Sequence, residues 1–514
     1  MTNPALAIRA LVTYAICIPL AMIVGWMLCN PLDYGSLGFF GLIAMLIVSP
    51  VLIKWNYQLM FFGLGSPIYC FFLQGNPPLS QVAVILCLGI AILDRTMNSN
   101  KRFVSPALLT WPFLFTIAMV LTTAELTGGI GLKALGGDVA GGKKYIALFI
   151  GCATFFAMTS RYIPKSQRNF YVLLFFLPGT LQLVSDLFRF LPPPLNYINL
   201  LIPPSQAAAT TGEFSFSTAR LASFAGSAGA IANFMLAKYG LRGILRGDRP
   251  LRFGLFFLML VLTMMGGYRI TLVSYLMMLT MLFFVEGLHR TRYLMVAIMV
   301  AVTTATLLVP TAKHLPMTFQ RTLSFVPLLE LDQEVRMDAE GSTKWREDMW
   351  RDLWPQVPQY LLLGKGYAMS REDMMMTGDS VLANGLAAKM DGSQNSLAIS
   401  GDYHNGPLST LMPFGVWGAI SYFWVTLAIL YVAYRNFKYG DAELKTVNTF
   451  LLVMCIQRFI GYFILFGAYS SDIGTFAYIA GFSIALNWGI CAPKREAVVV
   501  PRIKPLPHPR LLST

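Results

Sequence analysis

One histidine in this sequence lies where its side chain could act as a general base. His404 lies in the stretch DYHNGPLSTLMPFGVWG (402–418), between Asp402 and Asn405 and directly before a long apolar segment. An imidazole beside a carboxylate that orients it is typical of a base that works near neutral pH. A single histidine at such a boundary is also a common structural hydrogen bonder, and this alternative stays open.

Three arginines are equally unusual for an apolar chain. Arg220 lies in FSTARLASFAGSAG and Arg269 in MGGYRITLVS, each at the start of an apolar segment, whereas Arg458 lies inside one, in CIQRFIGYF. An arginine within a membrane helix is costly and usually faces a bundle interior or a water-filled cavity, although one at a helix end can reach lipid headgroups. Guanidinium groups fit the oxygens of a diphosphate. With His404, they predict a site that holds a diphosphate and deprotonates an acceptor hydroxyl.

Motifs for metal and nucleotide chemistry are missing from the sequence. There is no G-x-x-x-x-G-K-[ST], no H-E-x-x-H, no D-x-D and no C-x-x-C. The segment LGKGY (363–367) lacks the spacing of a phosphate-binding loop. A D-x-D pair is the usual metal site on a diphosphate, so fixed cations are expected to neutralise any diphosphate here. We therefore predict no metal and no cofactor.

The segment STKWREDMWRDLWPQVPQYLLLGKGY (342–367) predicts an amphipathic helix followed by a tight turn. Its tryptophans and other apolar side chains follow one another at helical spacing, with charges between them. Ser342 or Thr343 is placed to cap the start of this helix, and Pro355 with Pro358 to end it. The helix is expected to lie on the bilayer with its tryptophans at headgroup level.

Membrane helices must position all of these side chains, because the composition excludes a soluble fold. The 514 residues are 56% hydrophobic and 12% charged, with a mean hydropathy of +0.59, whereas soluble domains carry about a quarter charged residues. No β-barrel alternation is visible, so we predict an all-α polytopic membrane protein with about 14 (12–14) spans and one large external loop carrying short amphipathic helices. The predicted spans are 10–29, 35–54, 57–74, 79–94, 104–126, 144–160, 169–189, 221–240, 251–267, 269–286, 293–310, 407–434, 447–467 and 472–491.

The net charge of +14, from 39 basic and 25 acidic residues, is explained by orientation rather than by nucleic-acid binding. With the N-terminus in the cytoplasm, most Lys and Arg fall in cytoplasmic segments, as the positive-inside rule requires. The C-terminus then also lies inside. This predicts a bundle of about eleven spans at 1–310, a large external loop at 311–406, three spans at 407–491 and a basic, Pro-rich cytoplasmic tail at 492–514. Within the loop, 368–403 is expected to be an irregular flap.

The order of these features resembles the bacterial O-antigen ligase and polymerase superfamily. The resemblance covers roughly residues 210–430. Its motifs are an arginine followed by small residues, a second arginine at an external helix end, a loop core of the type R-x-x-x-W…P…G-x-G, and His-Asn followed by G-x-x-G. Here these are Arg220 with Ala222, Gly226 and Asn233; Arg269; Arg346, Trp350, Pro358, Gly364 and Gly366; and His404, Asn405, Gly415 and Gly418.

The resemblance implies a transferase in the bacterial inner membrane. Its donor would be a glycan on undecaprenyl diphosphate at the periplasmic face, and its acceptor a hydroxyl of lipid A core, of another lipid-linked glycan or of a protein. His404 would be the general base, and Arg220 and Arg269 would hold the diphosphate, without metal. We predict further substrate contacts from Arg458, Arg346, Asp402 and Asn405. Ligase and polymerase activity stay open, as do a transporter or flippase for an anionic lipid or glycan and a structural partner in an envelope complex.

Overall fold

The chain is mainly helical in the part that its computed structural model describes, which is residues 4–29, 34–73, 75–98, 103–130, 141–187, 192–204, 221–368 and 403–493. No strand occurs within these ranges, apart from an isolated bridge between Tyr69 and Pro78. The predicted all-α membrane fold is confirmed. The helices run as follows: α1 (Pro4–Cys29), α2 (Tyr34–Gly65), α3 (Leu79–Met97), α4 (Ala107–Leu126), α5 (Gly142–Met158), α6 (Arg168–Phe176), α7 (Leu183–Leu187), α8 (Ile198–Leu201), α10 (Ala222–Ile244), α11 (Pro250–Thr263), α12 (Arg269–Val285), α13 (Tyr293–Thr311), α14 (Met317–Leu323), α15 (Gln333–Leu353), α16 (Val357–Tyr360), α19 (Gly406–Tyr439), α20 (Lys445–Ile464) and α21 (Tyr469–Asn487).

Six helical segments of the described chain are long and apolar enough to cross a membrane. They are Leu79–Met97, Ala107–Leu126, Lys165–Leu187, Tyr293–His314, Gly406–Tyr439 and Ala442–Ile464. Shorter apolar helices add Thr13–Cys29, Pro250–Gly266 and Arg269–Val285. Helices therefore form at most of the predicted positions, but a count of fourteen spans stays a prediction.

The two spans predicted at 35–54 and 57–74 are wrong as separate helices. The single 32-residue helix α2 covers the first and half of the second, with Pro50 inside it. It ends at Gly65, and residues 66–73 are not helical. The ending has a local cause, because Pro67 disfavours helical geometry at the residue before it. Proline within a membrane helix is tolerated more readily than in a soluble one, so Pro50 does not divide α2.

The core of the bundle lies around α21, which packs along α5 and α19. Small residues allow this closeness: a Cβ added to Gly151 of α5 would lie 3.0 Å from the Cα of Gly474 in α21. Membrane helices associate through such small residues because van der Waals contact replaces the hydrophobic effect there. Aromatic rings fill the neighbouring space, with Phe175 stacked on both Tyr478 and Phe482 at centroid distances of 4.1 and 4.2 Å.

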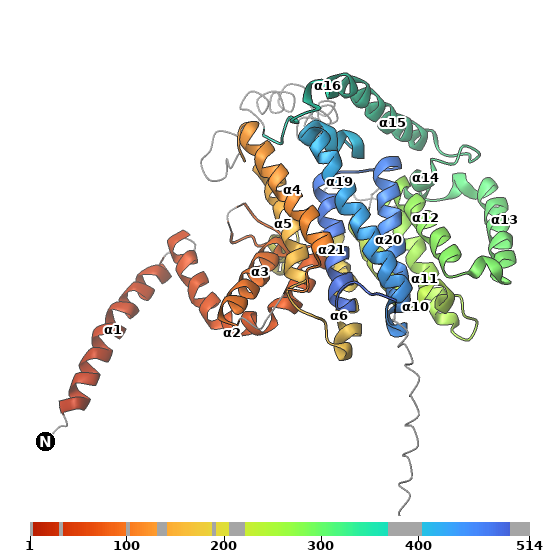
Figure 1. Ribbon diagram of the computed structural model, residues 1–514. Helices are drawn as coiled ribbons and strands as arrows, with labels where there is room; N and C mark the ends of the chain where they lie inside the picture. Colours follow the sequence, from red (N-terminus) through yellow and green to blue (C-terminus); the bar gives the residue numbers. More distant parts are fainter. Residues whose placement is uncertain are drawn as a thin grey trace, which may run out of the picture.

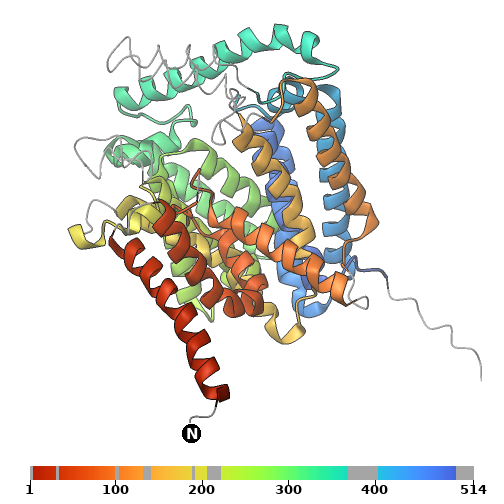
Figure 2. The same cartoon turned by 90° about the vertical axis from the view of Figure 1, so that its left-hand side faces the viewer.

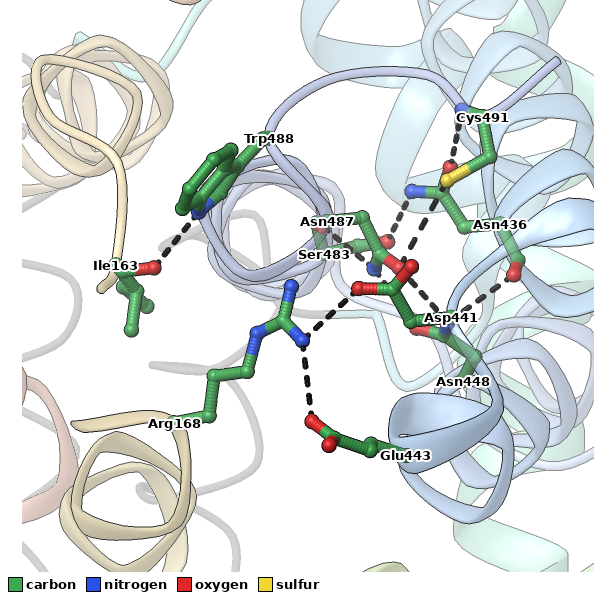
Figure 3. Close-up of polar contacts among 10 residues, drawn as sticks. All are labelled: Ile163, Arg168, Asn436, Asp441, Glu443, Asn448, Ser483, Asn487, Trp488 and Cys491. Carbon is green, nitrogen blue, oxygen red and sulfur yellow. Dashed lines mark hydrogen bonds and ion pairs between the residues drawn. The ribbon is translucent and has the colours of Figure 1, made fainter. Parts of the chain in front are cut away.

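The two ends of the bundle differ (Figure 1). Helix α15 lies across one end, called here the external end, and the view turned by 90° shows it there again (Figure 2). The C-termini of α19 and α21 and the start of α20 meet at the opposite, inner end. There Asn436, Asn448 and Asn487 form the asparagine cluster (Figure 3). Two hydrogen bonds join the side-chain amides of Asn448 and Asn487, at 2.9 and 2.8 Å. The Asn448 amide also donates to the main-chain carbonyl of Asn436 at 3.0 Å.

At the inner end, an ion pair and a hydrogen bond from an indole link segments that lie far apart in the sequence (Figure 3). The Arg168 guanidinium lies 3.0 Å from the Asp441 carboxylate and 3.6 Å from that of Glu443. The Trp488 indole N–H donates to the Ile163 carbonyl at 2.7 Å. These contacts join the start of α6 and the connection before it to the connection between α19 and α20 and to the end of α21.

The helix of the large loop begins earlier than predicted. Helix α15 starts at Gln333, so Ser342 and Thr343 lie inside it and cap nothing. The Thr343 hydroxyl donates to the Ala339 carbonyl at 2.9 Å, one turn back. The helix ends at Leu353, where Pro355 was predicted to stop it. Its apolar face packs on protein: Met349, with Trp345, Trp350 and Leu353 beside it, packs on Tyr403, Val357, Leu408 and Met412. Contact of this helix with the bilayer stays a prediction.

Candidate functional site

His404 lies between two aromatic rings at the external end. Its imidazole meets the Trp345 ring of α15 edge-on at a centroid distance of 5.7 Å and the Phe466 ring, between α20 and α21, at 4.8 Å. Its backbone is left-handed, with a φ of 50°. A non-glycine residue rarely holds this conformation, which clusters at functional sites where the surroundings enforce it. The imidazole is therefore fixed in place by a helix, a loop and its own backbone.

The residues around His404 hold that backbone. The Trp350 indole N–H donates to the Tyr403 carbonyl at 2.8 Å, and burial raises the pKa of Tyr403 to about 12. On the other side, the Asn405 side chain accepts from the Leu408 N–H at 3.1 Å and caps α19. Asn405 thus has a structural contact in this structure, and its binding of substrate stays a prediction.

A kink in α19 explains the G-x-G of the loop. At Gly415 the helix leaves helical geometry, with a φ of 58°, which frees carbonyls just before it. The Lys365 N–H donates to the Met412 carbonyl at 2.7 Å, and the Gly366 N–H to the Pro413 carbonyl at 2.9 Å. In return, the Val416 N–H donates to the Leu361 carbonyl at 2.7 Å. This set of three bonds, the loop latch, fastens the end of the loop helices to α19.

The loop latch requires glycine at three positions. Gly364 and Gly366 have φ values of 83° and 72°. A Cβ at Gly364 would lie 2.2 Å from the Pro413 carbonyl oxygen, and one at Gly415 would lie 2.3 Å from that of Leu361. Real Cβ atoms do not approach so closely. The two glycine motifs, which lie far apart in the sequence, therefore meet each other rather than a ligand.

Arg269 connects α12 to the loop. Its guanidinium donates to the Thr343 hydroxyl and to the Ala339 carbonyl of α15, each at 3.3 Å. The same side chain lines a cavity of about 500 Å³ under α15, which is also lined by the basic Lys344 and Arg351 and by the acidic Glu340, Glu347 and Asp348. Basic and acidic side chains balance there, so this cavity has no net positive charge. A role for Arg269 in holding a diphosphate stays a prediction.

Arg458 lines a second cavity, between α10, α12, α20 and α21. This Arg458 cavity has about 330 Å³ and includes Phe466, the ring that touches His404, together with Ile270 and Thr271, which follow Arg269. The Arg458 guanidinium lies 3.1 Å from the Asp472 carboxylate; the arginine side chain is 40% exposed and the aspartate side chain only 5%. The second Asp472 oxygen accepts from the Ala468 N–H at 3.0 Å. One terminal nitrogen of the guanidinium is thus held by Asp472, while the side chain stays partly exposed at the cavity.

The structure brings only some of the predicted site residues together. His404 and the Arg458 cavity share Phe466, and Arg269 lies next in sequence to two residues of that cavity. Arg346 lies on α15 beside Trp345, half-buried. Arg220 and Asp402 lie outside the described residues, as does most of the stretch 368–403. No cluster of His, Cys, Asp and Glu in the described chain could hold a metal ion.

The sequence reasoning missed two site residues. Asp472 pairs with Arg458 fourteen positions later, and Phe466 separates the histidine from the cavity. The sequence contains a signal for Asp472, because an acidic residue near the start of the last apolar segment needs a partner of opposite charge, as Arg458 does. Phe466 gives no such signal, because an aromatic residue in an apolar segment is ordinary.

Part of the chain matches a known protein family. A family model described as O-antigen ligase matches residues 254–423, which include Arg269, Arg346 and His404 but neither Arg220 nor Arg458. The resemblance to the O-antigen ligase and polymerase superfamily is thereby confirmed for this part of the chain. No curated protein matches the chain.

Proposed function

We propose that this chain, a member of the O-antigen ligase and polymerase superfamily through its domain at residues 254–423, transfers a glycan from a polyprenyl diphosphate to an acceptor sugar hydroxyl. The observation that carries the proposal is His404 itself. It lies inside the matched domain, is held in a left-handed conformation, and touches the ring that borders the Arg458 cavity. The cavity holds a cation, and Phe466 borders both this cavity and the imidazole.

In the proposed reaction, His404 removes the proton of the acceptor hydroxyl while that oxygen attacks the anomeric carbon of the donor sugar. The bond from this carbon to the diphosphate oxygen breaks, and polyprenyl diphosphate leaves with the electron pair. Guanidinium groups stabilise the charge that develops on the leaving group. We assign this task to Arg458, Arg269 and Arg220, and further substrate contacts to Arg346, Asp402 and Asn405. No metal or cofactor is assigned.

We place the protein in the bacterial inner membrane, with the external end in the periplasm and both termini in the cytoplasm. The charge distribution supports this orientation. Basic side chains gather at the inner end, where Arg168, Arg242, Arg435 and Lys445 lie at or beside helix ends. Cytoplasmic loops are enriched in Lys and Arg. The loop between α13 and α19 would then face the lipid-linked glycan.

A transfer assay on the purified full chain in lipid nanodiscs tests the proposal. The donor is a glycan on polyprenyl diphosphate, and formation of the new glycosidic bond is measured with and without EDTA. General-base catalysis contributes about 10²–10⁴-fold, so His404→Ala should lose this much. His314→Ala is the matched control, because that histidine is exposed after α13.

Three results would contradict the assignment. Full transfer by His404→Ala would show that the imidazole is structural. Loss of transfer in EDTA would show that a metal, not arginine alone, neutralises the diphosphate. Movement of the lipid-linked glycan across the bilayer without a new glycosidic bond would indicate a flippase. The acceptor in the product would separate the two activities: a glycan on lipid A core indicates a ligase, and a longer glycan on polyprenyl diphosphate indicates a polymerase.

A further inference from the structure

A third cavity lies at the inner end, away from the candidate functional site. It has about 670 Å³ and is lined where α10 and α12 end and α20 begins. Its cations are Arg242, Arg246 and Lys445, and its apolar wall includes Val285 and Phe437. From Lys445 to Arg458, thirteen residues of α20 span about 20 Å at a rise of 1.5 Å per residue. This basic cavity is therefore separate from the Arg458 cavity.

The one carboxylate among the residues that line this cavity, Glu286, accepts hydrogen bonds from the backbone. Helix α10 breaks at Gly240, which has a φ of 66°. The helix resumes with the N–H groups of Leu241 and Arg242 donating to the two oxygens of Glu286, at 2.9 and 2.7 Å. A Cβ at Gly240 would lie 2.9 Å from one of these oxygens. Glu286 is thus held by two backbone N–H groups, and its single negative charge faces three cations in the wall.

The basic side chains have weak partners in the described structure. Lys445 donates to the Phe437 carbonyl at 2.8 Å and lies over that ring at 3.8 Å. Arg242 donates to the Glu286 carbonyl at 3.2 Å. Arg246 pairs with Asp248 at 2.9 Å, but both side chains are more than half exposed, and such a surface pair contributes little. The wall therefore keeps a positive charge that its own residues do not neutralise.

We propose that the basic cavity binds a phosphate group, either that of an anionic phospholipid headgroup or a free phosphate. Two guanidiniums and an ammonium at the mouth supply donors for the phosphate oxygens, and Val285 and Phe437 supply an apolar surface for the glycerol and first acyl carbons. Basic cavities between membrane helices are typical sites for anionic headgroups. The site differs from the proposed donor site in position and in residues.

Native mass spectrometry of the detergent-solubilised full chain tests this site with phosphatidylglycerol, and with phosphatidylcholine as the neutral lipid. Each Lys or Arg near a headgroup contributes about five-fold in affinity, so Arg242→Gln with Lys445→Gln should weaken phosphatidylglycerol binding about 30-fold. The control is Arg249→Gln with Lys438→Gln, which removes the same charge from exposed positions that do not line the cavity. Its binding should be nearly unchanged.

A second variant keeps the charge and fills the space. Gly243→Met places a side chain in the cavity, where an added Cβ would meet only the Tyr239 Cβ, at 3.4 Å. It should lose phosphatidylglycerol with no change in melting temperature. Equal loss in both double variants, or unchanged binding in Gly243→Met, would overturn the site. If millimolar inorganic phosphate displaces the lipid, free phosphate is the ligand. If the lipid stays bound, the lipid headgroup is the ligand.

Discussion

The two ends of this bundle use buried polar groups in opposite ways. At the inner end, the side-chain amides of the asparagine cluster form hydrogen bonds with one another. Asn436 and Asn448 are buried, and the amides of Asn448 and Asn487 each donate to and accept from the other. At the external end, Arg458 makes one contact to Asp472 and is otherwise open to a cavity. His404 there lies in a backbone conformation that only its neighbours enforce.

This difference separates structural from functional polarity in a membrane bundle. A polar group that completes its hydrogen bonds within the protein stabilises helix association, whereas one with capacity left over is available to a ligand. Sequence does not make the distinction, since Asn448 and Arg458 both lie in α20 between apolar residues. The partners decide it. Variants at the two ends should therefore change different quantities: stability at the inner end and transfer at the external end.

The largest effect is expected at the loop latch. Gly415→Ala places a Cβ in a region of φ and ψ that is essentially glycine-only and against the Leu361 carbonyl. Strain and overpacking together cost about 2–6 kcal/mol. The loop should detach from α19, and glycan transfer should be lost together with resistance of residues 361–366 to proteolysis.

The control for the loop latch is Gly89→Ala in α3. A Cβ there would meet nothing within 4 Å, so helix propensity alone should act, and stability should be unchanged or slightly higher. A Gly415→Ala protein that transfers glycan normally would show that the external end works without the loop held against α19.

The inner end should respond in stability alone. Asn448→Ala removes both hydrogen bonds to the half-buried Asn487 amide, which keeps its bond to the Ser483 carbonyl but loses the donor to its oxygen. An unsatisfied buried group costs about 1–3 kcal/mol. The melting temperature should fall while transfer per folded molecule stays the same. A double-mutant cycle with Asn487→Ala, read from unfolding in detergent, should give a coupling of about 0.6–1.7 kcal/mol. A selective loss of transfer would break the division between the two ends.

Much of the fold could be predicted from the sequence because apolar length is a strong signal. The segments at 79–94, 104–126, 144–160 and 293–310 correspond to α3, α4, α5 and α13 within a few residues. The errors have physical causes. Residues 55–56, beside Lys54, were predicted to separate two spans, but apolar and aromatic side chains continue on both sides and α2 runs unbroken to Gly65. The start of α15 was missed because the segment from Gln333 to Gly341 has few apolar side chains, which are too few to indicate a helix from the sequence.

Less of the candidate site could be predicted. His404 and Arg458 stand out by residue type, since neither is common in an apolar segment. The pairing of Gly364 with Pro413, and of Phe466 with His404, depends on contacts across the fold that no local pattern encodes. The tight turn at Gly364 and Gly366 was predicted from the sequence, whereas Gly415 and Gly418 were identified by resemblance alone. These glycines are needed because α19 is kinked at Gly415. The sequence does not reveal this kink, since residues 407–434 form one continuous apolar segment.

At the external end, Arg458→Gln should weaken donor binding about ten-fold, or 1.4 kcal/mol. Glutamine keeps a hydrogen-bond donor for Asp472 but removes the charge that a diphosphate requires. The effect should appear in the KM for the lipid-linked glycan more than in kcat. Gln457→Ala is the control, since Gln457 lines the same cavity without charge. Equal effects of the two variants would show that the cavity shape matters and the charge does not.

The smallest effect separates two roles of a single residue, Asn405. Its side chain caps α19, and serine caps a helix about as well as asparagine, whereas alanine costs about 1 kcal/mol. If capping is its only task, Asn405→Ser should keep both the melting temperature and transfer, while Asn405→Ala loses a little of each. Loss of transfer in Asn405→Ser at an unchanged melting temperature would instead show that the amide contacts substrate. Asn405 would then combine the structural polarity of the inner end with the functional polarity of the external one.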